Sequence, residues 1–223
     1  VIAGPLIEAM RKEAILRPCI LYPGCFVSMD ETGLPTAIRV SEINIRPGEP
    51  EAQPVLRRLR NMGTLIRATL EGNLNEIEPE VRTDQLAICS ALVTGRGGPD
   101  GQKGYPWSCT RGEPVEIDFK YMKRKGIQVI PSAMMGSPRD GGFKSDGTRV
   151  AFLNANLSVK PDGSRGEAAE QFRKKLLDAF DNGKIRVIPR ENPNGNRLDL
   201  RRDIGFHYLE AEKIFPVSTI GCK

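Results

Sequence analysis

The sequence contains a single histidine and no pair of cysteines with the CxxC spacing. The five cysteines are Cys19, Cys25, Cys89, Cys109 and Cys222. An odd number of scattered cysteines favours free thiols in a reducing compartment over a disulfide framework. Acidic residues two apart, such as Glu76 and Glu78, are interpreted as a solvated strand face. We therefore predict no metal site and no cofactor.

Long apolar runs are absent as well. The run at 86–93 is far shorter than the roughly 18 residues that suggest a membrane span, so we expect no transmembrane segment. The chain begins with Val1 and not with methionine, so an N-terminal targeting signal is not assessable. The predicted location is cytoplasmic or virion-associated.

The common catalytic and nucleotide-binding motifs are also missing. The stretch 97–104 is rich in glycine, but it lacks the contiguous Gly-Lys-Ser/Thr of a P-loop. No GxGxxG joins a strand to a helix, and neither Ser90 nor Ser108 sits in a GxSxG elbow. A Ser–His or Cys–His mechanism would need His207, which we interpret as a structural residue of a strand. The sequence therefore gives no catalytic residue.

The clearest pattern that is present is a helix followed by a strand within 162–189. Asp162 and Ser164 can cap the helix, and Gly183 can stop it in a left-handed conformation before a strand at 185–187. Four apolar residues recur at three- and four-residue spacing: Ala169, Phe172, Leu176 and Phe180. This spacing predicts one apolar helix face that docks on a sheet.

Further elements follow from hydrophobic periodicity and turn residues. We expect helices from Pro5 to about Arg17 and over 55–70. The segment 85–94 is predicted as a helix, although its apolar residues would suit a buried strand too. Strands are expected at 19–22, 25–29, 37–46, 149–159, 198–202 and 204–210. A β-hairpin with a cationic tip is expected from 115–121 and 127–130.

One strand carries apolar residues of both parities. Ile38 and Val40 share one parity, whereas Ile43 and Ile45 share the other. Either both faces of this strand are covered, or a β-bulge switches the phase. The pattern alone does not choose between them.

The fold class predicted from these elements is α+β, a largely antiparallel sheet or sandwich flanked by about three helices. Adjoining strands joined by short turns outnumber any βαβ alternation. We expect a single domain over 1–223, with long loops near 95–112 and 132–147.

Basic residues recur along the chain. The 33 Lys and Arg exceed 28 acidic residues, which gives a net charge of +5 and a pI near 9.0. Arg197 accompanies Arg201 and Arg202 in the last of four basic clusters. The candidate binding residues for nucleic acid or an anionic surface are Arg57, Arg60, Arg67, Lys120, Lys123, Arg124, Lys125, Lys174, Lys175, Arg201 and Arg202. Charge does not distinguish RNA from acidic membrane as the partner.

Two hypotheses follow for function. The first is a non-enzymatic, self-associating structural protein that binds RNA or an acidic membrane, such as a viral capsid, matrix or nucleoprotein-like protein, and that forms a homo-oligomer. The alternative is an enzyme of an unrecognised class that acts through acidic residues or Cys109.

Overall fold

The computed structural model describes residues 3–32, 34–98, 102–105, 107–159 and 165–200. The chain divides into two compact units. Unit 1 comprises Val1–Glu49 and Leu59–Val81, and unit 2 comprises Pro50–Arg58 and Arg82–Lys223. Because each unit is compact by itself, the single domain over 1–223 stays a prediction.

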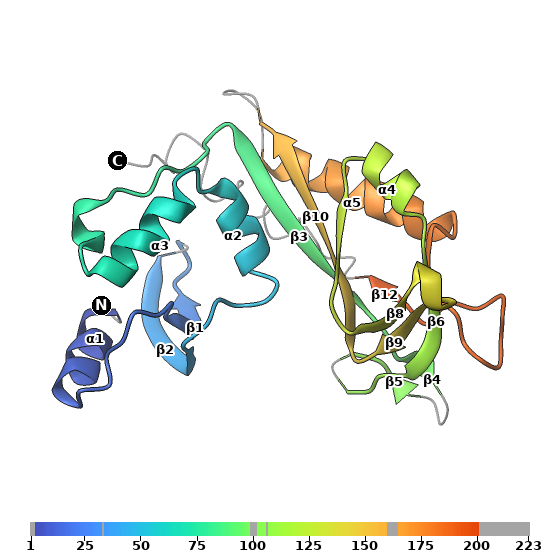
Figure 1. Cartoon of the computed structure of the whole chain (residues 1–223), viewed down its shortest axis with the longest axis horizontal. Coiled ribbons are helices and arrows are strands. Elements are labelled where there is room, and N and C mark those ends of the chain that lie inside the picture. The colour runs from blue at the N-terminus through green and yellow to red at the C-terminus, as the bar shows by residue number, and fades with distance from the viewer. Residues whose placement is uncertain (1–2, 33, 99–101, 106, 160–164, 201–223) are drawn as a thin grey trace. The chain divides into compact units, whose positions relative to one another are not determined.

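The fold is α+β with antiparallel sheets, as the sequence predicts (Figure 1). Five α-helices accompany the strands in the described residues. Every strand pair there is antiparallel. Among these residues no helix has the length and apolar character needed to cross a membrane.

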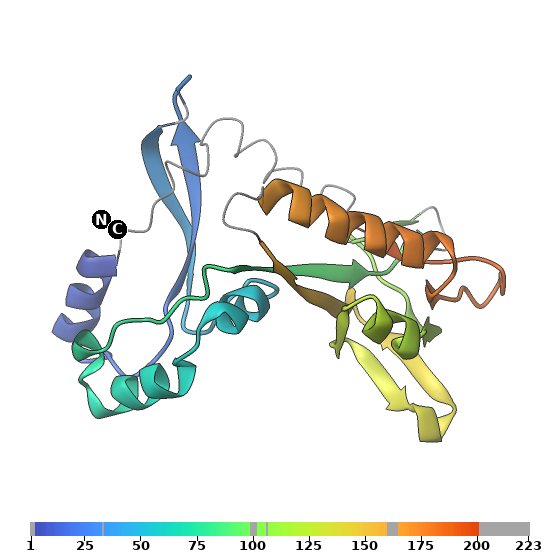
Figure 2. The ribbon, with the colours of Figure 1, turned by 90° about the horizontal axis from the view of Figure 1, so that it is seen from above.

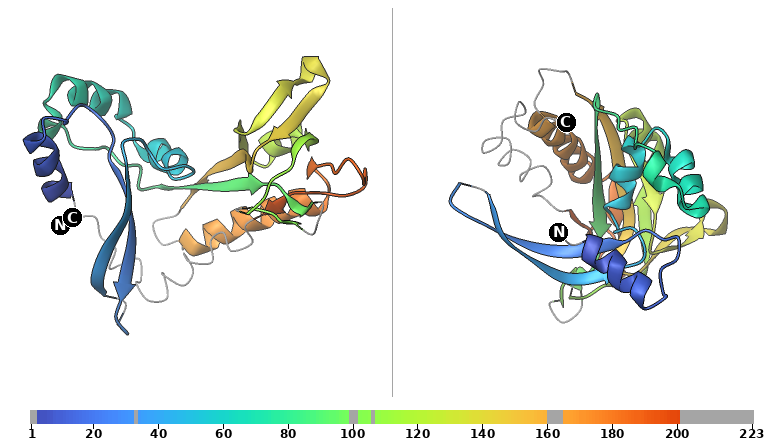
Figure 3. Two further views of the ribbon diagram at one scale, coloured as in Figure 1. Left: turned by 90° about the horizontal axis from the view of Figure 1, so that it is seen from below. Right: turned by 90° about the vertical axis from the view of Figure 1, so that its left-hand side faces the viewer.

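Unit 1 contains a β-hairpin and short helices. Its elements are α1 (Ala3–Lys12), β1 (Tyr22–Met29), β2 (Pro35–Asn44), α3 (Met62–Glu71) and the 3-10 helix η1 (Leu74–Glu76). The strands expected at 19–22 and 25–29 are thus a single strand, β1. It pairs with β2 in a sheet of two strands (Figure 3).

A β-bulge in β2 resolves the mixed parity of its apolar residues. Gly24 pairs with Glu42 but Cys25 pairs with Val40, so Ser41 is an extra residue in β2. Its hydroxyl donates to the Gly24 carbonyl oxygen at 3.0 Å. Because the bulge shifts the phase by one residue, the apolar residues before and after it point to the same face.

Unit 2 contains two four-stranded sheets, with strand orders β12-β3-β10-β7 and β11-β6-β9-β8. The first is built from β12 (Asp199–Leu200), β3 (Gln85–Val93), β10 (Arg149–Ser158) and β7 (Gln128–Pro131). The second is built from β11 (Ile185–Val187), β6 (Arg111–Ile117), β9 (Gly142–Asp146) and β8 (Met134–Ser137). The remaining elements are α2 (Ala52–Arg58), the short pair β4 (Arg96–Gly98) and β5 (Gln102–Lys103), α4 (Phe119–Arg124), η3 (Pro138–Asp140) and α5 (Arg165–Asp181).

The hydrophobic core of unit 2 forms where α5 lies along β3 and β10 (Figure 2). Of the four residues predicted for the apolar helix face, Ala169, Phe172 and Leu176 are buried and Phe180 is partly buried against the core, which confirms that face. Gly183, with φ of +63°, follows the helix, and β11 begins at Ile185, as the sequence predicts. Asp162 and Ser164, the expected caps, lie outside the described residues.

Two helix predictions are wrong. The segment expected as a helix over 85–94 is strand β3, which is paired with β10 on one side and β12 on the other. Every residue of β3 is buried or half-buried, so this strand carries a continuous apolar run that resembles a buried helix. The helix expected over 55–70 is two helices, because residues 59–61 pair with 78–81 instead: Leu59 bridges Val81, and Arg60 N donates to Glu80 O.

The expected hairpin of 115–121 with 127–130 is also wrong. β6 ends at Ile117, and β7 pairs with β10 and not with β6. Asp118 caps α4 by accepting a hydrogen bond from Tyr121 N at 2.8 Å, and Met122 is buried. The region 132–147, expected as a loop, contains the hairpin β8–β9. Strand β10 is confirmed. The strand expected at 204–210 lies outside the described residues.

Candidate functional site

Residues 95–112 form the glycine-rich segment that follows β3. Its backbone comes close to itself at Gly95 and Ser108. Gly95 has φ of +109°, and a Cβ atom there would collide with the Ser108 carbonyl oxygen. Only glycine fits this position, because any other residue would have an unfavourable left-handed backbone and a Cβ atom that clashes with Ser108. The two ends of this segment are therefore held together at the end of β3.

A tight turn within this segment presents Tyr105. Gly104 is buried with φ of +83°, and its carbonyl oxygen accepts hydrogen bonds from Trp107 N and Ser108 N. Gly104 N in turn donates to Ser108 Oγ at 3.0 Å. These bonds fix the turn, so the tyrosine next to Gly104 has a defined position.

Arg149, the first residue of β10, contacts the ring and the hydroxyl of Tyr105. Its guanidinium donates to the Tyr105 hydroxyl at 2.9 Å and lies 5.5 Å from the ring centroid. Both side chains are half-buried. A planar guanidinium held against an aromatic ring is well suited to bind phosphate or carboxylate. This Tyr105–Arg149 pair is the candidate site for an anionic ligand.

A buried ion pair supports the end of the same segment. Arg197 Nε donates to Glu113 Oε1 at 3.2 Å, and both side chains are almost fully buried. The hydroxyl of Thr110 also donates to Glu113, and Arg197 contacts Glu191 as well. Ser145 Oγ donates to the Thr110 carbonyl oxygen at 3.1 Å. Charged groups so deeply buried fix the backbone from 110 to 113 in one arrangement.

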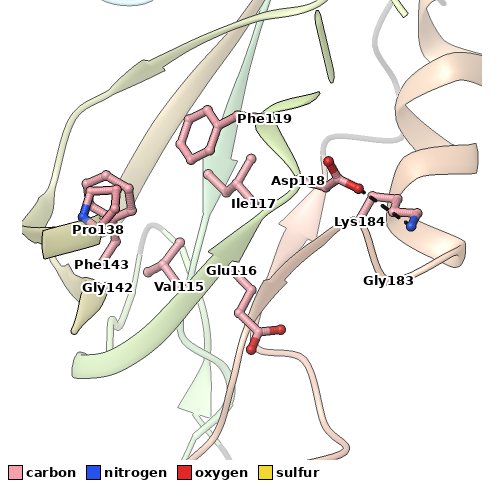
Figure 4. A pocket seen from close by; sticks show the side chains of 10 residues that line it. All are labelled: Val115, Glu116, Ile117, Asp118, Phe119, Pro138, Gly142, Phe143, Gly183 and Lys184. Carbon is pink, nitrogen blue, oxygen red and sulfur yellow. Dashed lines mark ion pairs between the residues drawn. The ribbon is translucent and has the colours of Figure 1, made fainter. Parts of the chain in front are cut away.

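A cleft of about 430 Å³ lies elsewhere in unit 2, next to β6 (Figure 4). Its residues are Val115, Glu116, Ile117, Asp118, Phe119, Pro138, Gly142, Phe143, Gly183 and Lys184. The rings of Phe119 and Phe143 have centroids 6.0 Å apart. Asp118 and Lys184 form an ion pair of 3.6 Å on the side away from these rings. The cleft is therefore apolar on one side and charged on the other.

Two carboxylates near this cleft, those of Asp118 and Asp178, have a lowered pKa, which favours their charged form. The hydrogen bond from Tyr121 N lowers the pKa of Asp118, and the charge of Lys184 lowers it further. The pKa of Asp178 on α5 is lowered by the hydrogen bond from the Tyr121 hydroxyl and by Lys125. Carboxylates used as a helix cap and as ion-pair partners are poorly placed to donate a proton at neutral pH. The cleft is thus better suited to binding than to acid–base catalysis.

The described residues contain no group of three or more His, Cys, Asp or Glu side chains that could hold a metal. Unit 1 does offer a pair of oxygen donors, because Glu42 and Asn44 share the polar face of β2. Asn44 Nδ2 is buried without a hydrogen-bond partner. Magnesium is often held by one or two carboxylates together with substrate phosphates, so this pair could hold Mg²⁺ only with help from a ligand.

The basic residues predicted as binding candidates are distributed over both units. Arg57 lies on α2 of unit 2, where it donates to Gln128 and to Asn156, whereas Arg60 and Arg67 belong to unit 1. The residues of α4 are Lys120, Lys123 and Arg124, with Lys125 as its C-cap, and those of α5 are Lys174 and Lys175. Lys125 forms an ion pair of 3.5 Å with Asp178, which joins α4 to α5. As a binding set these residues stay a prediction.

The remaining residues named from the sequence are not assigned to the Tyr105–Arg149 site. Arg201, Arg202 and His207 lie outside the described residues. Cys109 is a half-buried free thiol beside the closed segment. Sequence reasoning missed both Arg149 and Glu113, although it singled out the glycine-rich stretch 97–104 close to which they lie.

The sequence matches no protein-family model. It is similar to phosphoribosylamine–glycine ligase from Methanobrevibacter smithii, with 28% identity over 170 residues, 76% of this chain and 33% of the relative. The enzyme of that name from Archaeoglobus fulgidus is 28% identical over 184 residues, 81% of this chain and 35% of the relative. A bifunctional purine biosynthetic protein from Schizosaccharomyces pombe is 28% identical over 213 residues, 95% of this chain and 22% of the relative.

Among solved structures, phosphoribosylamine–glycine ligase from Thermotoga maritima is 17% identical, with a TM-score of 0.43 over 81% of this chain and 34% of that chain. A TM-score this low does not establish a shared fold. The chain spans about a third of the length of the first curated relatives that it matches.

These relatives overturn the leading functional hypothesis. The prediction of a non-enzymatic, RNA- or membrane-binding structural protein of viral type is wrong, because the relatives are named as ligases and purine biosynthetic proteins. Virion association has no support either. The alternative, an enzyme of an unrecognised class, fits the relatives better, and the part assigned to acidic residues or Cys109 stays a prediction. The basic composition suggested an RNA or membrane partner, but net charge alone does not identify a ligand or a reaction.

Proposed function

We propose that this chain is part of a ligase that resembles phosphoribosylamine–glycine ligases and joins an amine to the carboxylate of an amino acid. The observation that supports this most is sequence similarity over 67% to 81% of the chain to four enzymes of that name. The similarity to the S. pombe protein extends it to nearly the whole chain. A cytoplasmic location accompanies this proposal.

The chain would supply a binding surface and not the whole catalytic machinery. It spans about a third of the relatives, and the pKa values of Asp118 and Asp178, near its cleft, are lowered by structural partners. The substrate named for the relatives carries a phosphate, which an arginine fork binds well. We assign contact with that phosphate to the Tyr105–Arg149 pair, which the closed glycine segment holds in place.

The activity can be tested with a chimera. These residues would replace the matched third of the M. smithii ligase, and the chimera would be incubated with glycine, phosphoribosylamine and a nucleoside triphosphate. Joining an amine to a carboxylate in water is uphill, so the triphosphate is included to drive it. We expect one glycine to be consumed for each amide formed. A folded chimera that makes no glycine amide would contradict the proposal.

The binding role of Arg149 is tested separately. Arg149→Met should weaken binding of ribose 5-phosphate at least about tenfold, because a charge-assisted hydrogen bond contributes about 1.5–3 kcal/mol. Calorimetric titration gives the affinity, and unphosphorylated ribose is the matched ligand. Arg139→Met removes the same charge from the exposed η3 turn and should leave the affinity unchanged. Equal losses in both variants would show that only net charge matters.

A further inference from the structure

The hairpin of unit 1 has one uniformly apolar face. Residues paired across the strands share a face, and the pairs Val27–Ile38, Cys25–Val40 and Pro23–Ile43 all fall on the same one. We call these six residues the apolar hairpin face. The opposite face carries polar and mixed pairs, including Gly24–Glu42 and Tyr22–Asn44. The Ser41 bulge is what keeps Ile43 on the same side as Val40.

This face is not covered by the described residues. Val27, Ile38, Val40 and Ile43 are each 44% to 49% exposed. Ala68 is the one buried apolar residue among the described residues of unit 1. A two-stranded hairpin is marginally stable by itself in water, and a contiguous exposed apolar surface marks an interaction site. A sheet with one apolar and one polar face is built to be covered on one side.

We propose that the apolar hairpin face is the docking surface for a segment of a longer ligase-like polypeptide that lies outside these 223 residues. This inference rests on the proposed function. The S. pombe match covers 95% of the chain, so it includes the hairpin, yet it makes up only 22% of that relative. The hairpin therefore has much additional polypeptide available to cover it in the relative. The occupant must itself present an apolar face, because none of the six residues of the apolar hairpin face is charged.

The experiment combines the purified chain with the part of the A. fulgidus ligase that lies outside the matched region. We expect a one-to-one complex by light scattering and at least tenfold slower hydrogen exchange of the β1 and β2 amides in that complex. Val27→Glu and Val40→Glu should each weaken the complex at least tenfold, since a carboxylate would be buried without a partner. Both positions are exposed in the chain, so the variants should fold. Exchange of β3 and β10 amides checks that unit 2 is intact.

The matched control is Phe26→Glu on the opposite face of β1, which places a new carboxylate at a residue that is 72% exposed and paired with Arg39. It should leave the complex unchanged. Absence of a complex would overturn the proposal. Slow hydrogen exchange of the β1 and β2 amides in the monomeric chain would also overturn the proposal, because it would show that the chain's own residues cover the face. A dimer of the chain that Val40→Glu disperses would assign the face to a second copy and overturn it too. A complex that forms without making a glycine amide would reject the proposed function and leave the docking surface standing.

Discussion

At the scale of single residues, the buried ion pair of Arg197 and Glu113 is the most consequential contact. The Arg197 side chain is 4% exposed and that of Glu113 is 5% exposed. Removing two charges from water is expensive, and only the mutual attraction and the added hydrogen bonds offset it. Thr110 and Glu191 supply such bonds. The pair therefore couples the end of the glycine-rich segment to residues near position 197.

The first prediction concerns this pair. Glu113→Gln should lower the free energy of unfolding by about 3 kcal/mol, because it leaves the buried guanidinium without its charge partner. Glu191→Gln removes the other carboxylate that contacts Arg197, but that side chain is 59% exposed, so we expect less than about 1 kcal/mol. Urea denaturation of the two variants measures both values. Equal losses of unfolding free energy in the two variants would show that burial of Glu113 does not strengthen its interaction with Arg197.

Sequence reasoning placed Arg197 in a basic cluster with Arg201 and Arg202, whereas its side chain is buried in an ion pair. The error is physical, because its carboxylate partner Glu113 is 84 residues away in the chain. Local composition reports the sign of the charge but not whether a distant strand brings a carboxylate to it. Arg149 was missed for the same reason: Tyr105, its partner, is 44 residues away.

At the scale of secondary-structure elements, α4 shows how one side chain overrides a clear pattern. Apolar and polar residues alternate through Val115–Tyr121, which is typical of a strand. The structure follows that pattern only to Ile117. Asp118 then accepts from Tyr121 N and starts a helix that buries Met122. A capping aspartate within an alternating run was the signal that could have indicated this change.

This cap gives the second prediction, a pH dependence. The pKa of Asp118 is lowered in the folded chain, mainly by the Tyr121 N hydrogen bond. Its contribution to stability is therefore fully present above the unfolded pKa of about 3.9, and it is lost as the pH falls through the lower folded pKa. The stability difference between the wild type and Asp118→Asn should stay level from pH 6 to about pH 5 and then shrink towards pH 2. Unfolding curves across this range measure it.

Lys184→Met is the control for the same experiment. It removes the ion pair with Asp118 at 3.6 Å but keeps the hydrogen bond from Tyr121 N. Most of the pH dependence should remain in this variant, because the backbone hydrogen bond is the largest cause of the lowered pKa. If Lys184→Met abolished the dependence, the ion pair and not the cap would be the source.

The other elements follow the sequence where neighbours in the chain decide the outcome. The helix–strand pattern within 162–189 is found as α5 and β11, because its apolar spacing and glycine stop are local features. The segment expected as a helix at 85–94 fails because the strands on both sides of it, β10 and β12, come from distant parts of the chain. The parity change in β2 was read correctly as a choice between covered faces and a bulge, and pairing with β1 selects the bulge.

At the scale of the whole molecule, the buried apolar residues are distributed unequally. Unit 2 has a continuous core that includes Phe172, Leu153 and Ile185, all fully buried. The described part of unit 1 has Ala68 alone. Because burial of apolar surface is the dominant favourable contribution to folding, unit 2 should hold nearly all the stability of the isolated chain. The homo-oligomer expected from the sequence stays a prediction, and it would change this distribution only if it covered unit 1.

The third prediction tests that inequality by native-state hydrogen exchange of the isolated chain. Amides of β3, β10 and α5 should exchange slowest, at the rate of global unfolding, and those of β1 and β2 fastest, through local opening. Phe172→Ala should destabilise unit 2 by about 3–5 kcal/mol and speed the slow set. It should leave the β1 and β2 rates unchanged, because these amides already open without unit 2. If the substitution accelerated both sets equally, the two units would unfold together, and the single cooperative domain predicted over 1–223 would be the correct description.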